Sequence, residues 1–88
     1  MSWTLKLSKE AAKEFRHLPR ERQEQLSQAI EEMKEDPLRG DVRPIKSGKF
    51  KGALRKRVGR YRIVFALEPS EGLIEIAAIL IRTEKTYR

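Results

Sequence analysis

Cysteine is absent from this 88-residue chain, and histidine occurs once, at His17. A disulfide framework and a cysteine-based zinc site are therefore excluded, and a lone histidine is a poor basis for a metal site. Stability must come from packing, and we expect neither a metal nor a cofactor. Because a chain this short has room for one core, we expect a single domain over residues 1–88.

Long apolar runs are missing as well. No apolar segment approaches the roughly 20 residues that a membrane-spanning helix needs. The opening residues, Met1 to Leu7, are too short and too charged at their flank to act as a signal peptide. We therefore expect a cytoplasmic protein without a membrane partner.

Positive charge is plentiful and unevenly distributed. Lysine and arginine number 20 against 13 acidic residues, for a net charge of +7. The segment from Arg43 to Arg62 is rich in both and contains no aspartate or glutamate. Such a block favours a polyanionic partner through phosphate contacts and counterion release, although a scattered excess would only indicate a solvated face.

The first half of the chain predicts one strand and two helices. Trp3, Leu5 and Leu7 alternate with polar residues, which is typical of a half-buried strand. Ser8 is placed to cap a short helix that Pro19 ends. Apolar residues then recur at helical spacing over residues 20–35, which predicts a second helix. The two helices form a hairpin whose single apolar seam needs a sheet to pack on.

The second half predicts three strands after an irregular segment. Residues 38–52 hold proline and glycine and read mainly as a loop, followed by strands near 53–58, 61–67 and 73–81. The last run is apolar at both parities, which predicts a central strand. The expected fold is therefore α+β, in the order β-α-α-β-β-β, with an antiparallel sheet core and the helical hairpin on one face. The first strand lies at an edge or beside the last.

A two-residue turn at Gly59-Arg60 fixes the pairing of the first hairpin. It places Arg57 opposite Arg62 and Arg55 opposite Val64, with all three arginines on one face. Since like charges across a strand pair are destabilising, the cluster favours an anion site over a purely structural role. Lys56 interrupts the opposite, apolar face, so either the register shifts locally or its ammonium reaches water near an edge.

Two segments carry a resemblance to the RelE/ParE toxin superfamily, which extends over essentially the whole chain. The run Leu54-Arg-Lys-Arg-Val-Gly-Arg-Tyr-Arg-Ile-Val-Phe65 resembles the family's alternation of basic and apolar residues followed by Val-Gly-x-Tyr-Arg. The last segment, Leu80-Ile-Arg-Thr-Glu-Lys-Thr-Tyr-Arg88, is similar to the family's closing strand, which is followed by a basic position and a near-terminal tyrosine. Together they indicate the RelE-like branch.

The resemblance implies a ribosome-dependent endoribonuclease that cuts messenger RNA in the decoding site and is neutralised by a cognate antitoxin. Carried over by motif, the catalytic residues are Arg55, Arg57, Arg62, Arg82 and Tyr87. We expect neighbouring basic residues to bind RNA or the ribosome, namely Lys46, Lys49, Lys51, Lys56 and Arg60.

The implied chemistry is attack of a ribose 2′-hydroxyl on the adjacent phosphate. Guanidinium groups suit the charge that develops on the phosphoryl oxygens, but arginine is a poor general base. Tyr87 is a candidate acid or stacking residue, and Glu84 a less favoured base. Two alternatives stay open: a ParE-like inhibitor of DNA gyrase, and an RNA-binding or decayed toxin that does not cut.

Overall fold

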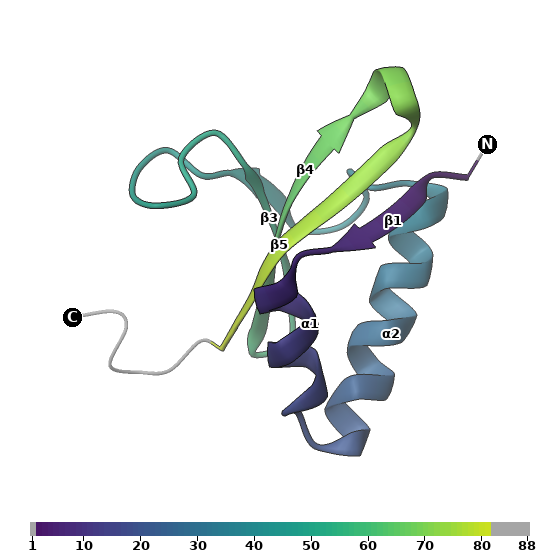
Figure 1. Ribbon diagram of the computed structural model, residues 1–88, viewed down its shortest axis with the longest axis vertical. Coiled ribbons are helices and arrows are strands. Elements are labelled where there is room, and N and C mark those ends of the chain that lie inside the picture. The colour runs from purple at the N-terminus through teal and green to yellow at the C-terminus, as the bar shows by residue number, and fades with distance from the viewer. Residues whose placement is uncertain (1, 82–88) are drawn as a thin grey trace.

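The computed structural model describes residues 2–81, and over this range the strands form one five-stranded sheet with two helices (Figure 1). In chain order the elements are β1 (Thr4–Leu7), α1 (Lys9–Arg16), α2 (Arg20–Glu35), β2 (Val42–Pro44), β3 (Leu54–Val58), β4 (Tyr61–Glu68), a 3-10 turn (Pro69–Glu71) and β5 (Leu73–Ile81). The α+β fold with a helical hairpin beside the sheet is confirmed. The short strand β2, in the segment expected to be a loop, is an addition.

The sheet has the order β1-β5-β4-β3-β2 and is mixed. β1 runs parallel to β5, whereas every other neighbouring pair is antiparallel. The first strand thus lies at an edge and beside the last, which satisfies both options left open. Residues 73–81 form an inner strand between β1 and β4, as the apolar run predicts, while β4 holds the middle place of the sheet.

A β-bulge in β5 accounts for part of its apolar pattern. Val64 pairs with Ala78 and Phe65 with Ile76, so Ala77 is an extra residue without a partner in β4. The insertion shifts the parity of β5, and Ile79 therefore faces the same core as Ile76. Apolar residues at both odd and even positions of this strand therefore reflect the change of register at the bulge.

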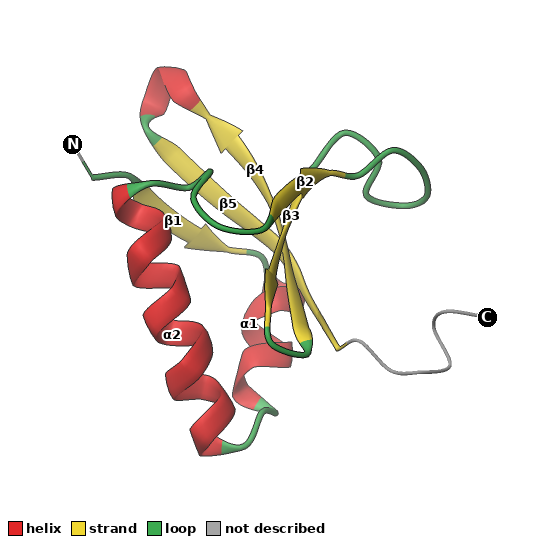
Figure 2. Ribbon diagram, turned by 180° about the vertical axis from the view of Figure 1, so that it is seen from behind, coloured by secondary structure: helices red, strands yellow, loops and turns green. Residues whose placement is uncertain are grey.

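The helices bury one face of the sheet (Figure 2). Leu26, Ile30 and Met33 of α2 and Ala11 of α1 join a core with apolar residues of β4 and β5. Among residues 2–81, Phe65 is the largest fully buried side chain, at 0% exposure. The helices leave the opposite face of the sheet uncovered. The loop between β2 and β3 extends away from the helices (Figures 1 and 2).

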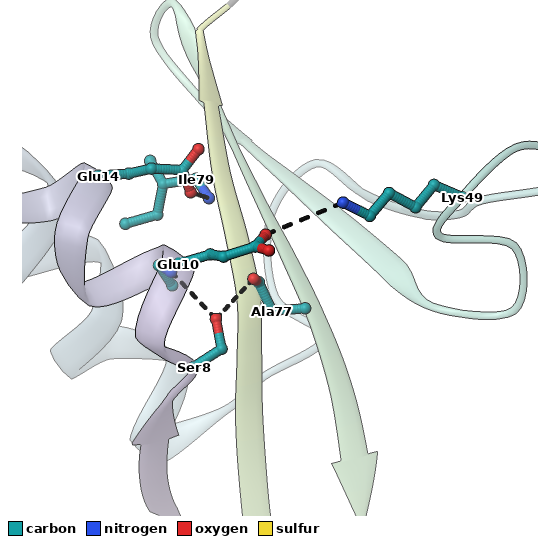
Figure 3. A network of polar contacts seen from close by, with 7 residues as sticks. Ser8, Glu10, Glu14, Lys49, Ala77 and Ile79 are labelled. Carbon is teal, nitrogen blue, oxygen red and sulfur yellow. Dashed lines mark hydrogen bonds and ion pairs between the residues drawn. The ribbon is translucent and has the colours of Figure 1, made fainter.

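Ser8 joins the start of α1 to the bulge (Figure 3). Its hydroxyl accepts a hydrogen bond from the Ala11 amide at 3.0 Å and donates one to the Ala77 carbonyl at 2.7 Å. Nearby, a Glu14 carboxylate oxygen accepts from the Ile79 amide at 2.9 Å. Beyond the end of β1, the backbone carbonyl of Ala77 and the backbone amide of Ile79 in β5 thus find hydrogen-bond partners in the side chains of Ser8 and Glu14.

Replacing Ser8 with alanine is expected to lower the free energy of unfolding by about 1–2 kcal/mol, because one hydroxyl both caps α1 and meets the bulge carbonyl. Urea denaturation followed by circular dichroism measures the change. Ser27→Ala, an exposed position inside α2, serves as the control and should change stability by less than about 0.5 kcal/mol. An equal effect of the two substitutions would contradict this role for Ser8.

Among residues 2–81, no helix has both the length and the apolar character needed to cross a membrane.

Candidate anion-binding face

The β3–β4 hairpin has the register expected from its two-residue turn. Arg57 pairs with Arg62, Arg55 with Val64, and Val58 with Tyr61. Gly59 opens the turn with a φ of 58°, a left-handed conformation that glycine adopts without steric cost. The sequence prediction that Arg55, Arg57 and Arg62 share one face is therefore confirmed, and this face is the one that the helices leave uncovered.

β2 adds a further arginine to this face. Arg43 pairs with Arg55 across the β2–β3 ladder, so the two side chains share a face. Its Nε lies 3.6 Å from Oδ1 of Asp41, and the Arg43 side chain is 71% exposed. Sequence reasoning missed Arg43 because it did not predict β2. We call Arg43, Arg55, Arg57 and Arg62 the arginine face.

A hollow of about 420 Å³ lies against the arginine face. Arg55 and Arg62 line it from the sheet, and Lys46 and Lys49 line it from the loop that joins β2 to β3. Its apolar lining includes Val64, whose side chain is 1% exposed although it points away from the helices. Cationic groups around an apolar floor form a site that suits an anion carrying an apolar or aromatic part.

The loop over residues 45–53 has a defined shape. At its base, the Ile45 amide donates to the Ala53 carbonyl at 2.9 Å and the Gly52 amide donates to the Ile45 carbonyl at 3.0 Å. At its tip, Nζ of Lys49 lies 4.0 Å from Oε2 of Glu10 on α1 (Figure 3). Backbone hydrogen bonds thus hold the loop beside the hollow.

The remaining basic residues of the expected binding set lie in different places. Lys51 is exposed in the loop, and Arg60 is exposed in the hairpin turn. Lys56 pairs with Ile63 on the helix-facing side of the sheet and is only 8% exposed. Its ammonium donates to the Arg39 carbonyl at 2.8 Å, next to Gly40. The register does not shift, and the structure does not bring Lys56 to the arginine face.

The C-terminal candidates Arg82, Glu84 and Tyr87 lie outside the described residues, so their roles stay predictions. Within residues 2–81, no group of three or more His, Cys, Asp or Glu side chains is arranged to hold a metal ion.

The model of the family described as the ParE toxin of the type II toxin-antitoxin system parDE matches residues 2–86. The chain belongs to this toxin family. The resemblance to the RelE/ParE superfamily seen in the sequence is thereby confirmed. No curated protein matches the toxin.

Solved RelE proteins share the fold of this toxin. The archaeal RelE–RelB complex from Pyrococcus horikoshii matches with a TM-score of 0.80 and 20% identity, over 96% of this chain and 99% of that one. The RelBE2 toxin-antitoxin complex of Mycobacterium tuberculosis matches with a TM-score of 0.80 and 19% identity, over 93% of this chain and 100% of that one. The isolated Escherichia coli RelE toxin matches with a TM-score of 0.72 and 20% identity, over 94% of this chain and 87% of that one.

Proposed function

We propose that this toxin is a ribosome-dependent endoribonuclease that cuts messenger RNA in the decoding site and so inhibits translation. The observation that carries the proposal is the convergence of Arg55 and Arg62 with Lys46 and Lys49 on one hollow. The fold shared with RelE toxins supports it. Work at the ribosome would place the protein in the cytoplasm.

The arginine face suits phosphoryl chemistry. When a ribose 2′-oxygen attacks the adjacent phosphorus, a cyclic phosphate forms and the bond to the 5′-oxygen breaks. Negative charge develops on the phosphoryl oxygens, and fixed guanidinium groups stabilise it through paired hydrogen bonds. Arg55 and Arg62 are the candidates for this task, with Arg57 beside Arg62.

The two proton transfers need other groups, since arginine stays protonated. The 2′-hydroxyl must lose a proton to a base, and the leaving 5′-oxygen must gain one. Tyr87 is the proposed acid, Glu84 is the candidate base, and Arg82 would add charge stabilisation. These assignments come from the resemblance of the C-terminal motif.

The decisive experiment is in vitro translation of a defined messenger RNA, with cleavage products mapped by primer extension. Ribosome-dependent cuts at discrete codons are expected with the toxin, and none with messenger RNA alone. Stalled translation without cuts would favour the alternative of a toxin that binds RNA but does not cleave it.

A second candidate function is inhibition of DNA gyrase, because the family model that matches residues 2–86 is that of the ParE toxin. A supercoiling assay with purified gyrase separates the two. Inhibition of supercoiling together with intact messenger RNA in the translation assay would favour this second function.

We also propose a cognate antitoxin that covers the arginine face with an acidic or amphipathic segment. The similar RelE chains from Pyrococcus horikoshii and Mycobacterium tuberculosis were solved as complexes with their antitoxins. Arg57 and Arg43 are exposed and available for acidic partners. The toxin expressed alone should arrest growth; a chain that is harmless alone and binds no protein tightly would contradict this proposal.

The buried Lys56 should contribute nothing to RNA binding, although the sequence suggested that it would. Each phosphate contact on a single strand adds about 0.7 to the slope of log Kd against log salt. Lys49→Met should lower this slope by about that amount, whereas Lys56→Met, which keeps an unbranched buried chain, should leave it unchanged. Fluorescence anisotropy with a labelled RNA measures both. An equal drop for Lys56→Met would return Lys56 to the binding surface.

A further inference from the structure

Phe50 is set apart from the other aromatic residues of the fold. Among residues 2–81, Tyr61 and Phe65 belong to the core, and Trp3 and Phe15 pack against it. Phe50 does neither. It stands in the loop between β2 and β3, between Lys49 and Lys51, and lines the hollow on the face that the helices leave uncovered.

The backbone around Phe50 is held in place. The Phe50 carbonyl accepts a hydrogen bond from the Ala53 amide at 3.0 Å, and the Lys51 amide donates to the Gly48 carbonyl at 3.2 Å. The ring is half-buried, and Nζ of Lys49 lies 5.5 Å from its centroid. A partly exposed aromatic residue on a fixed backbone, next to cationic side chains, is an arrangement by which proteins stack the bases of single-stranded nucleic acids.

We propose that Phe50 stacks on a base of the RNA strand whose phosphate Arg55 and Arg62 hold. This inference rests on the proposed function and deepens it, because the hollow then takes a nucleotide with its base and not a phosphate alone. The volume of about 420 Å³ falls within the range of small-molecule sites, roughly 300–1,000 Å³. Such stacking accepts any base, because every base has a flat face, but the base must be free of a pairing partner. The hollow would therefore favour unpaired over base-paired RNA.

A purely structural role for Phe50 makes a different prediction. The ring lines the same hollow as Val64, which is 1% exposed, so it helps to cover an apolar part of the sheet. Leucine would serve that purpose nearly as well, since it buries a similar apolar area. A base, in contrast, needs the flat face of an aromatic ring. Phe50→Leu therefore separates the two roles, and Phe50→Trp should preserve stacking.

The test compares two labelled single-stranded probes of equal length and charge by fluorescence anisotropy with the full chain. One is 2′-O-methyl RNA, which lacks the attacking hydroxyl, and the other carries abasic sites at its centre. Phe50→Leu and Phe50→Ala should weaken binding of the first probe about 5- to 150-fold, equivalent to ~1–3 kcal/mol. Phe50→Trp should bind it like the wild type, and the abasic probe should bind all four proteins alike. Thermal unfolding of each variant should show an intact fold.

Three outcomes would overturn the inference: wild-type affinity of Phe50→Leu for the first probe, an equal loss for both probes, or no binding of either probe by the wild type. The translation assay keeps this result apart from the proposed function. Ribosome-dependent cuts by a wild type without base-dependent binding would remove the inference alone. Base-dependent binding without cuts would remove the nuclease proposal and leave stacking on Phe50 in place.

Discussion

Replacing Arg62 with alanine is expected to slow ribosome-dependent RNA cleavage about a hundred- to a thousandfold, equivalent to ~3–4 kcal/mol of transition-state stabilisation. Arg62 lines the hollow, and it follows Tyr61 in the segment that most resembles the toxin family. It is also the Cα partner of Arg57. Single-turnover cleavage of a programmed ribosome complex measures the effect.

The stability of Arg62→Ala should stay within about 1 kcal/mol of the wild type, because the substitution relieves a like-charge pair and leaves the apolar face intact. Loss of cleavage with an intact fold is thus the expected signature. Arg20→Ala, at an exposed position at the start of α2, is the control and should cut at nearly the wild-type rate. Near wild-type cleavage by Arg62→Ala, or inactivity caused by unfolding, would remove Arg62 from the catalytic set.

Phe65→Ala is expected to have the largest effect on stability, a loss of about 3–5 kcal/mol. Phe65 is 0% exposed and pairs with Ile76 just before the bulge, where α2 and β5 meet β4. Truncation leaves a cavity that the surrounding strands cannot easily close. Because a domain of 88 residues has only about 4–13 kcal/mol of stability in total, such a loss would unfold a large part of the protein in mild denaturant.

Urea denaturation followed by the fluorescence of Trp3, the single tryptophan, measures this loss. Leu38→Ala is the matched control, since Leu38 is 58% exposed and its truncation should change stability by less than about 0.5 kcal/mol. If the free energy of unfolding of Phe65→Ala lay within about 1 kcal/mol of the wild-type value, Phe65 would not be a buried core residue beside the bulge.

Local signals made much of this fold predictable. Ser8 and Pro19 bracket α1 through a side-chain cap and a ring that cannot continue the helix. Gly59 fixes a two-residue turn, and a turn of known length sets every pair along β3 and β4. The shared face of Arg55, Arg57 and Arg62 follows from that register alone, which is why the sequence was enough to find it.

Features that depend on distant partners were not predictable. β2 spans three residues and ends at Pro44, so it has too little pattern of its own, and Arg43 was missed with it. The bulge at Ala77 is matched by Ser8, 69 positions earlier in the chain. The acceptor for Lys56 is a backbone carbonyl 17 residues away, in a loop whose path no periodicity reports. Such contacts exist only once the tertiary structure has formed.

The parallel pairing of β1 with β5 has a consequence for synthesis. Thr4 to Leu7 are synthesised well before their partners, Leu73 to Ile76. Pairings of such large sequence separation close slowly, because loop entropy opposes them until late. The sheet cannot be completed while the chain is still short, so an unfinished nascent toxin lacks the fold on which its hollow depends. Because Leu80 of β5 lines the hollow, the hollow is completed only after that strand has been made.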